Sequence, residues 1–170
     1  MYRRSPYRRY GGKYSNETTF INCSIDSTMN VGACFPYDET SHLYGVDVVN
    51  PSTVMGNRKV KNFTLKFTSN NFTGPVVGCL VYVPQGTNVN TLTLTSEANN
   101  LYEPNQNVIA NFIIPPSDDS NSTITVSSKL ARNLSSNDRI CLIFGLPGGA
   151  QLGQGSTASV CGTVNFSIKY

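Results

Sequence analysis

The chain has 170 residues, a mass of 18.5 kDa and a formal net charge of +3, and only 14% of its residues are charged. A chain of this length suits a single domain that buries about two-thirds of its unfolded surface. No apolar run approaches the roughly 18 residues of a membrane-spanning helix, and no apolar stretch follows the basic N-terminus as it would in a secretory signal. We therefore expect neither membrane insertion nor secretion.

Positive charge is concentrated in the first thirteen residues, which contain five bases and no acid. These bases are Arg3, Arg4, Arg8, Arg9 and Lys13. Subtracting them from the 13 bases of the chain leaves 8 bases against 10 acids in residues 14–170, a net charge of −2. Pro6, Gly11 and Gly12 disfavour a helix in this segment. We predict that residues 1–14 form a disordered or extended arm that binds phosphates without reading sequence.

Tyrosines are interleaved with the arginines of the arm. They are Tyr2, Tyr7, Tyr10 and, at the end of the arm, Tyr14. A tyrosine ring can stack on an unpaired base, a contact worth roughly 1–3 kcal/mol per base. The mixture therefore favours single-stranded nucleic acid over a membrane, because a membrane-binding segment would need an apolar stripe. A solvated tail and a nuclear import signal are the alternatives.

Short segments of alternating polarity follow the arm in chain order and predict about eight antiparallel strands. They span Thr19–Ile25, Tyr44–Val49, Lys59–Thr68, Val76–Pro84, Asn107–Pro115, Thr123–Ser128, Arg139–Phe144 and Val160–Tyr170. Clusters of Gly, Pro, Asn and Ser separate them, a pattern typical of an all-β sandwich or barrel of two sheets. We place this single domain at residues 15–170.

Three of these segments carry further expectations. The strand at Val160–Tyr170 alternates regularly and should bury one face, whereas Val76–Pro84 is apolar on both faces and should be a central strand covered on each side. A short helical turn is expected near Leu92–Asn100. The long connections at 26–43 and 85–106 are expected to be functional or to build subunit contacts.

A second basic cluster, Arg58, Lys59, Lys61 and Lys66, marks the start of a predicted strand. Simple alternation places Lys59 and Lys61 on the same face as Phe63 and places Lys66 on the opposite face. We predict that Arg58, Lys59 and Lys61 supplement the arm in binding nucleic acid. Protection of an edge strand by charge is the alternative.

Catalysis, metals and cofactors have little support in the sequence. The five cysteines are odd in number and widely spaced, at positions 23, 34, 79, 141 and 161, and form no zinc-binding motif. We expect most of them to be reduced and buried, which suits an intracellular compartment. The single histidine, His42, has no acid placed to orient it. We predict no catalytic residue, no metal site, no cofactor and no enzymatic activity.

Four segments carry a resemblance to a known family: GNRKVKNFTLKF (Gly56–Phe67), LVYVPQGT (Leu80–Thr87), LYEPNQNVI (Leu101–Ile109) and SSKLARNLSSNDRICLIF (Ser127–Phe144). In wording, order and spacing they resemble the capsid proteins of small circular single-stranded DNA viruses that encode a replication initiator, the circovirus-like viruses. The resemblance covers roughly residues 44–170.

The resemblance implies a single jelly roll, sixty copies of which form a T=1 icosahedral shell around a circular single-stranded DNA genome. It also implies location in the virion, and in the host nucleus or cytoplasm during assembly, with a host receptor and the nuclear import machinery as further partners. Many arms in that family are longer and richer in arginine, so this arm would neutralise only part of a genome. The alternatives are an RNA satellite-type capsid and a trimeric cytokine-like or lectin-like jelly-roll binding module.

Overall fold

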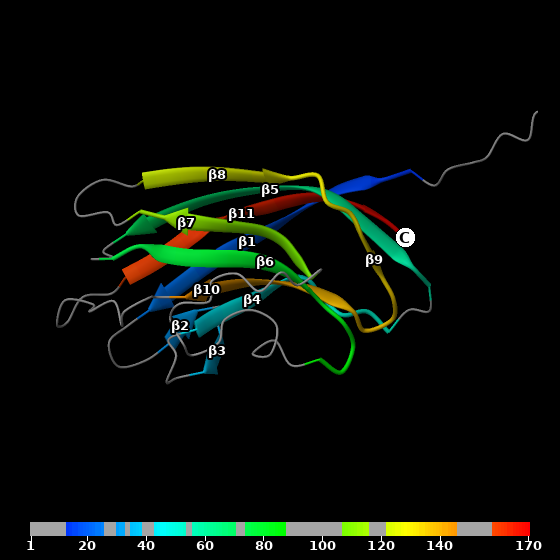
Figure 1. Cartoon of the computed structure of the whole chain (residues 1–170), viewed down its shortest axis with the longest axis horizontal. Coiled ribbons are helices and arrows are strands. Elements are labelled where there is room, and N and C mark those ends of the chain that lie inside the picture. The colour runs from blue at the N-terminus through cyan, green and yellow to red at the C-terminus, as the bar shows by residue number, and fades with distance from the viewer. Residues whose placement is uncertain are drawn as a thin grey trace, which may run out of the picture.

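The computed structural model describes residues 13–25, 30–32, 35–38, 43–53, 56–70, 74–87, 107–115, 122–145 and 158–170. Every regular element within these ranges is a β-strand (Figure 1). None of the described residues belongs to a helix long and apolar enough to cross a membrane.

The described ranges form two antiparallel sheets, here called sheet A and sheet B. Sheet A has the strand order β2-β1-β11-β5-β8, with β9 also paired to β5, and sheet B has the order β3-β4-β10-β6-β7. The strands are β1 (Ser15–Ile25), β2 (Asn30–Gly32), β3 (Phe35–Asp38), β4 (Leu43–Val49), β5 (Arg58–Asn70), β6 (Val76–Val83), β7 (Val108–Ile114), β8 (Ser122–Ser128), β9 (Arg132–Leu134), β10 (Arg139–Gly145) and β11 (Ala158–Lys169).

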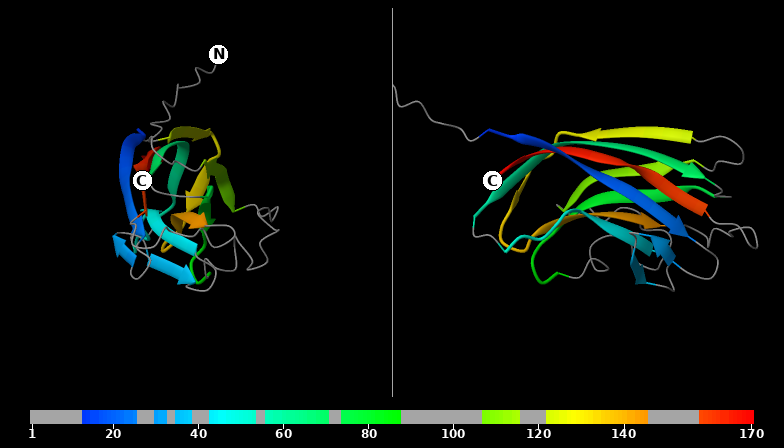
Figure 2. Two further views of the ribbon diagram at one scale, coloured as in Figure 1. Left: turned by 90° about the vertical axis from the view of Figure 1, so that its left-hand side faces the viewer. Right: turned by 180° about the vertical axis from the view of Figure 1, so that it is seen from behind.

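The connectivity of the eight longer strands is that of a jelly roll. Their orders within the two sheets are β1-β11-β5-β8 and β4-β10-β6-β7, and the chain crosses repeatedly from one sheet to the other (Figure 2). Two interlocking Greek keys of this kind define the jelly roll among double-sheet folds. The expectation of an all-β jelly-roll sandwich is therefore confirmed.

All eight predicted strands are present, with ends that differ by a few residues. The sequence did not predict the short strands β2, β3 and β9, of which β2 and β3 fall within the long connection at 26–43. The helical turn expected near Leu92–Asn100 and the arm at residues 1–12 lie outside the described residues.

A core of aliphatic and aromatic side chains fills the space between the sheets. Phe67 of β5 stacks on Phe112 of β7 at 5.1 Å between ring centroids, and Phe144 of β10 meets Phe67 edge-on at 5.8 Å. The inward residues of β11 are buried as its alternation predicts. Full burial of each such side chain stabilises the fold by about 1.5–3 kcal/mol.

The prediction that Val76–Pro84 forms a central strand covered on both faces is confirmed. Strand β6 lies between β10 and β7, and its residues Val76 and Leu80 belong to the core between the sheets. On the outer face of sheet B, residues of β6 and β10 form a second buried cluster. Its members are Cys79, Val81, Val83, Cys141 and Ile143.

The cysteines agree only partly with the expectation that most are reduced and buried. Cys79 and Cys141 are buried thiols, and burial raises the pKa of the Cys79 thiol to about 12. Cys161 is free but exposed, since it lies on the outward side of β11. Cys23 is disulfide-bonded and is therefore an exception to the expectation that most of the cysteines are reduced.

Candidate nucleic-acid interface

A β-bulge in β5 decides which face of sheet A its lysines occupy. The register between β5 and β11 shifts between Asn165 and Ser167, and Asn62 has a φ of 56°, in the left-handed region that asparagine tolerates better than most residues. The bulge adds one residue to β5, so Lys61 and Asn62 both stay out of the core and Phe63 enters it.

The bulge reverses two of the orientations predicted from simple alternation. Lys59 and Lys61 do not share a face with Phe63, because the extra residue lies between them and the buried half of the strand. Lys66 lies opposite Phe63, as predicted, but it is exposed on the same outward side as Lys59 and Lys61, so the prediction that it points away from these two lysines is wrong.

Four lysines therefore lie on the outer face of sheet A. We call this set the lysine face: Lys59, Lys61 and Lys66 of β5, and Lys169 of β11. Lys59 and Lys169 are direct cross-strand partners, whereas Lys61 is opposite Ser167 and Lys66 is opposite Thr163. Like charges placed directly opposite each other on neighbouring strands destabilise a sheet. An anion bound between Lys59 and Lys169 would relieve this repulsion.

The acids whose side chains the structure describes, Glu17, Asp47 and Asp138, do not compensate the lysine face. Glu17 is opposite the buried Phe166 in the β1–β11 register and accepts a hydrogen bond from the Tyr170 hydroxyl at 2.9 Å. Asp47 belongs to β4 in sheet B, and Asp138 is buried just before β10. The positive charge of the lysine face is thus not balanced by any of these three carboxylates.

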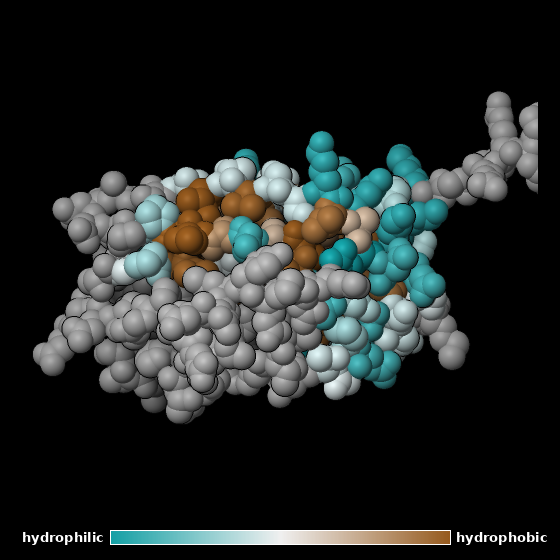
Figure 3. Space-filling model, in the orientation of Figure 1, coloured by the Kyte–Doolittle hydropathy of each residue, from teal (hydrophilic) through white to brown (hydrophobic). Residues whose placement is uncertain are grey.

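The arm joins the domain beside the lysine face. Lys13 is exposed, and the Nζ atom of Lys61 lies 3.9 Å from the centre of the Tyr14 ring, a cation–π contact between the start of the domain and β5. Figure 2 shows the start of β1, the start of β5 and the end of β11 at one end of the sandwich. Seen from the side drawn in Figure 3, hydrophilic side chains also gather at this end.

Polar side chains occupy the sheet between the lysines and bond across strands. Thr18 donates to Asn165 Oδ1 at 2.6 Å, and Ser167 donates to Asn16 Oδ1 at 2.9 Å. These bonds hold short polar groups in fixed positions next to the lysines. Hydroxyl and amide groups of this kind commonly contact phosphate and sugar.

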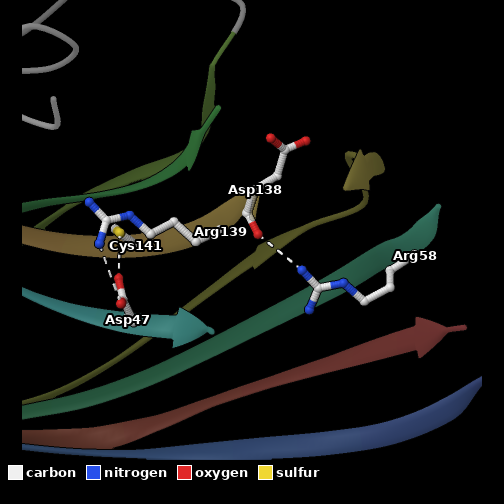
Figure 4. Close-up of polar contacts among 5 residues, drawn as sticks. All are labelled: Asp47, Arg58, Asp138, Arg139 and Cys141. Carbon is white, nitrogen blue, oxygen red and sulfur yellow. Dashed lines mark hydrogen bonds and ion pairs between the residues drawn. The ribbon is translucent and has the colours of Figure 1, made fainter. Parts of the chain in front are cut away.

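Arg58, the first residue of β5, lies apart from the lysine face. Only 9% of its surface is exposed, and its guanidinium donates to the carbonyl oxygen of Asn50 at 3.0 Å. It also donates to the carbonyl oxygen of Asp138 at 3.0 Å (Figure 4). It connects the end of β4 to the turn before β10. The structure therefore does not bring Arg58 together with Lys59 and Lys61, because alternation turns it to the inner side of the strand.

Asp138 is the centre of a second polar contact in the same region. Its carboxylate accepts hydrogen bonds from the Tyr82 hydroxyl at 2.7 Å and from the backbone N–H groups of Ser135 at 2.7 Å and Gln85 at 3.0 Å. Burial by itself raises the pKa of Asp138, but these hydrogen bonds and the nearby Arg58 charge outweigh it, so the net pKa is lowered. The carboxylate is therefore held in its charged form and fastens three segments of the chain together.

On the sheet B side, the charges that the structure describes are paired. Arg139 lies 3.5 Å from Asp47, and the Cys141 thiol donates to Asp47 Oδ1 at 2.8 Å (Figure 4). This pair adjoins the buried outer cluster of β6 and β10. The two outer faces of the sandwich thus differ: the lysines of sheet A have no described acid beside them, whereas Arg139 of sheet B does.

The structure describes only part of the predicted site. Lys59 and Lys61 lie on the outward side of β5, and Lys61 contacts Tyr14, the residue after Lys13. The other predicted residues lie outside the described residues: Arg3, Arg4, Arg8, Arg9, Tyr2, Tyr7 and Tyr10. Sequence reasoning placed Lys169 on the polar side of its strand but missed both Lys169 and the exposed Phe20 of β1 as candidate site residues. Simple alternation predicts the outward orientation of both residues, because residues two apart on a strand point to the same face. Lys169 is two residues after Ser167, and Phe20 is two residues before Asn22.

No family model matches the chain, and no curated protein matches it either. Within the described ranges, no three His, Cys, Asp or Glu side chains are grouped so that they could hold a metal ion.

Proposed function

We propose that this chain is a viral capsid protein that assembles into a closed icosahedral shell and packages single-stranded DNA. The observation that carries the proposal is the lysine face, a basic surface that none of the three described carboxylates balances, on one side of a jelly roll at the end where a basic arm enters the domain. The motif resemblance favours DNA over RNA and sixty copies in a T=1 arrangement. The jelly roll is compatible with this function, and viral capsids are among its common uses.

In this proposal the outer face of sheet A points into the shell. Packaged phosphates would lie against the lysine face and the arm, and sheet B would face away from the genome. Five arm bases and four lysines give nine positive charges per subunit, so sixty copies would supply about 540 charges. The arms alone would supply about 300 charges. The lysine face would therefore supply part of the neutralisation that the short arm cannot.

The mass of the purified protein tests assembly. Size exclusion with light scattering should give about 1.1 MDa, the mass of sixty copies of 18.5 kDa. A stable species near 56 kDa, about three copies, would contradict the shell and favour the trimeric binding module. A megadalton particle that copurifies with RNA alone would favour the satellite-type capsid.

The salt dependence of binding tests the role of the lysine face. Lys59, Lys61 and Lys66 are changed together to Gln in the full chain, and binding to a single-stranded DNA oligonucleotide is measured at several salt concentrations. Each phosphate contact on a single strand contributes about −0.7 to the log–log slope, so the slope should become shallower by about 2. The matched Lys→Arg variant keeps the charge and should keep the slope.

The arm is tested in the same assay. Changing its four arginines to Ala should make the slope shallower by about 3 and reduce the copurifying nucleic acid, while the domain stays folded. Unchanged nucleic-acid content in both the arm variant and the lysine variant would contradict packaging by these residues.

A further inference from the structure

We infer that Phe20 is a base-stacking residue and that the lysine face accepts single strands in preference to duplexes. The inference rests on the proposed function and specifies the ligand of that same surface. It assigns to the folded domain a preference for unpaired nucleotides that phosphate contacts by themselves cannot provide.

Phe20 occupies an unusual position for a phenylalanine. It lies in the middle of β1 with 77% of its surface exposed, between Thr18 and Asn22 on the outer face of sheet A. Burying such a ring would stabilise the protein by about 1.5–3 kcal/mol, and the exposed ring of Phe20 does not contribute this stabilisation. The ring is instead presented to solvent on a face whose other side chains are mostly Thr, Asn, Ser and Lys.

The strand register places a lysine near the ring. Phe20 is opposite Thr163, Thr163 is opposite Lys66, and Lys66 is opposite Thr125, so these four residues form one row across sheet A. Strands are about 4.8 Å apart, so the backbones at Phe20 and Lys66 are separated by about 10 Å. A base on the ring and its phosphate near the lysine would fit this separation, with a small hydroxyl side chain between them.

A second pairing of ring and lysine lies directly before the start of the same strand. The Lys61 ammonium is over the ring of Tyr14, six residues before Phe20. Six residues of extended strand span about 20 Å. The outer face thus presents two aromatic rings, each with a lysine, along one line that begins where the arm ends.

This chemistry fits unpaired nucleotides better than the other partners of an exposed ring. A duplex hides the faces of its bases in the stack, so it could use the lysines but not Phe20, whereas every unpaired base offers a face for stacking. The core of a protein–protein interface is depleted in lysine, and this ring lies in a row with Lys66 on a face that holds three further lysines.

The test compares a 20-nucleotide oligo-dT with a duplex of the same length, using fluorescence anisotropy and the full chain. Phe20→Ala should weaken binding of oligo-dT about tenfold, which corresponds to about 1.4 kcal/mol, and should change duplex binding less than twofold. Phe20→Leu keeps an apolar side chain but cannot stack, so it should behave like Ala, whereas Phe20→Tyr should retain binding. Ile113→Ala, at a 61% exposed residue of sheet B, is the matched control and should change neither affinity.

Three outcomes would overturn the inference. Equal losses for oligo-dT and duplex would mean that Phe20 does not read unpaired bases. Full affinity in Phe20→Leu would mean that the ring is not needed. Unchanged affinity with an altered assembled mass would make Phe20 a subunit contact. The lysine variants test the proposed function and not this inference. If the lysine variants lose binding and Phe20→Ala does not, the proposed function is supported and the inference about Phe20 is wrong.

Discussion

Replacing Asp138 with Asn tests the claim that one buried carboxylate fastens three segments of the fold. Only 5% of the residue is exposed, and its Oδ2 atom accepts two hydrogen bonds while Oδ1 accepts one. The Asn amide can keep the two bonds on its oxygen but turns its nitrogen toward the Gln85 N–H group, where two donors then meet. The substitution removes one hydrogen bond and the charge that strengthens the other two.

The expected cost follows from these bonds. A hydrogen bond to a charged group contributes about 1.5–3 kcal/mol and a neutral one about 0.5–1.5 kcal/mol. The substitution removes the hydrogen bond from the Gln85 N–H group and weakens the bonds from Tyr82 and Ser135. Together these losses should decrease the free energy of unfolding by about 3–5 kcal/mol. For a domain of this size each kcal/mol lowers Tm by about 2–4 °C, so Tm should decrease by about 10 °C. Urea unfolding and calorimetry of unassembled subunits measure both quantities.

The pH dependence gives an independent check. The folded pKa of Asp138 is lowered, so its carboxylate stabilises the fold above the unfolded pKa of about 3.9. This contribution disappears as the pH falls through the lower folded pKa. The difference in unfolding free energy between wild type and D138N should have its maximum value at pH 7 and should decrease at pH values below about 4.

The control is Tyr82→Phe, which removes only the hydrogen bond from the phenol. It should cost about 1–2 kcal/mol, well below the cost of D138N. A D138N protein as stable as wild type, or a difference that stays constant down to about pH 2, would refute the assignment of Asp138 as a charged anchor.

Two further predictions concern glycine and cysteine positions. A Cβ at Gly162 would collide with the β5 backbone and with the ring of Phe67. Gly162→Ala should therefore lower the free energy of unfolding, measured by urea titration, by about 3 kcal/mol. An unchanged free energy of unfolding would show that β11 does not approach β5 this closely. Native unassembled subunits should react with iodoacetamide at Cys161, whereas Cys79 and Cys141 should react only after unfolding, since both are buried and the pKa of Cys79 is about 12. Mass spectrometry of labelled peptides checks this, and rapid labelling of Cys79 in the native state would contradict its burial.

The sequence predicted the strands well because each longer strand has its own alternating or apolar pattern. Strand β9 was missed since Arg132–Leu134 is too short to show a period, and β2 is equally short. The jelly-roll order came from the resemblance, because pairing between segments more than a hundred residues apart leaves no local signal. The pairing of β1 with β11 is the clearest example.

The site was harder to predict than the fold. Period-two reasoning assumes an uninterrupted strand, and the bulge at Asn62 breaks that assumption in the middle of the basic cluster. Lys59 and Lys61 were therefore assigned to the side of the buried Phe63, whereas they lie on the outer face together with Lys66. Arg58 was grouped with the lysines by charge, but the bulge turns it to the inner side of β5 together with Val60, where carbonyl oxygens accept its hydrogen bonds.

Under the proposed function, the direct opposition of Lys59 and Lys169 has a consequence for the stability of the proposed shell. A polyanion that binds only the folded subunit adds RT ln(1 + [L]/Kd) to its unfolding free energy, about 2.7 kcal/mol at a hundredfold excess over Kd. Under the proposed function, the genome would thus act as a folding ligand for the subunits that enclose it. We expect filled particles to melt at a higher temperature than empty ones, so that thermal stability reports how completely a shell is loaded.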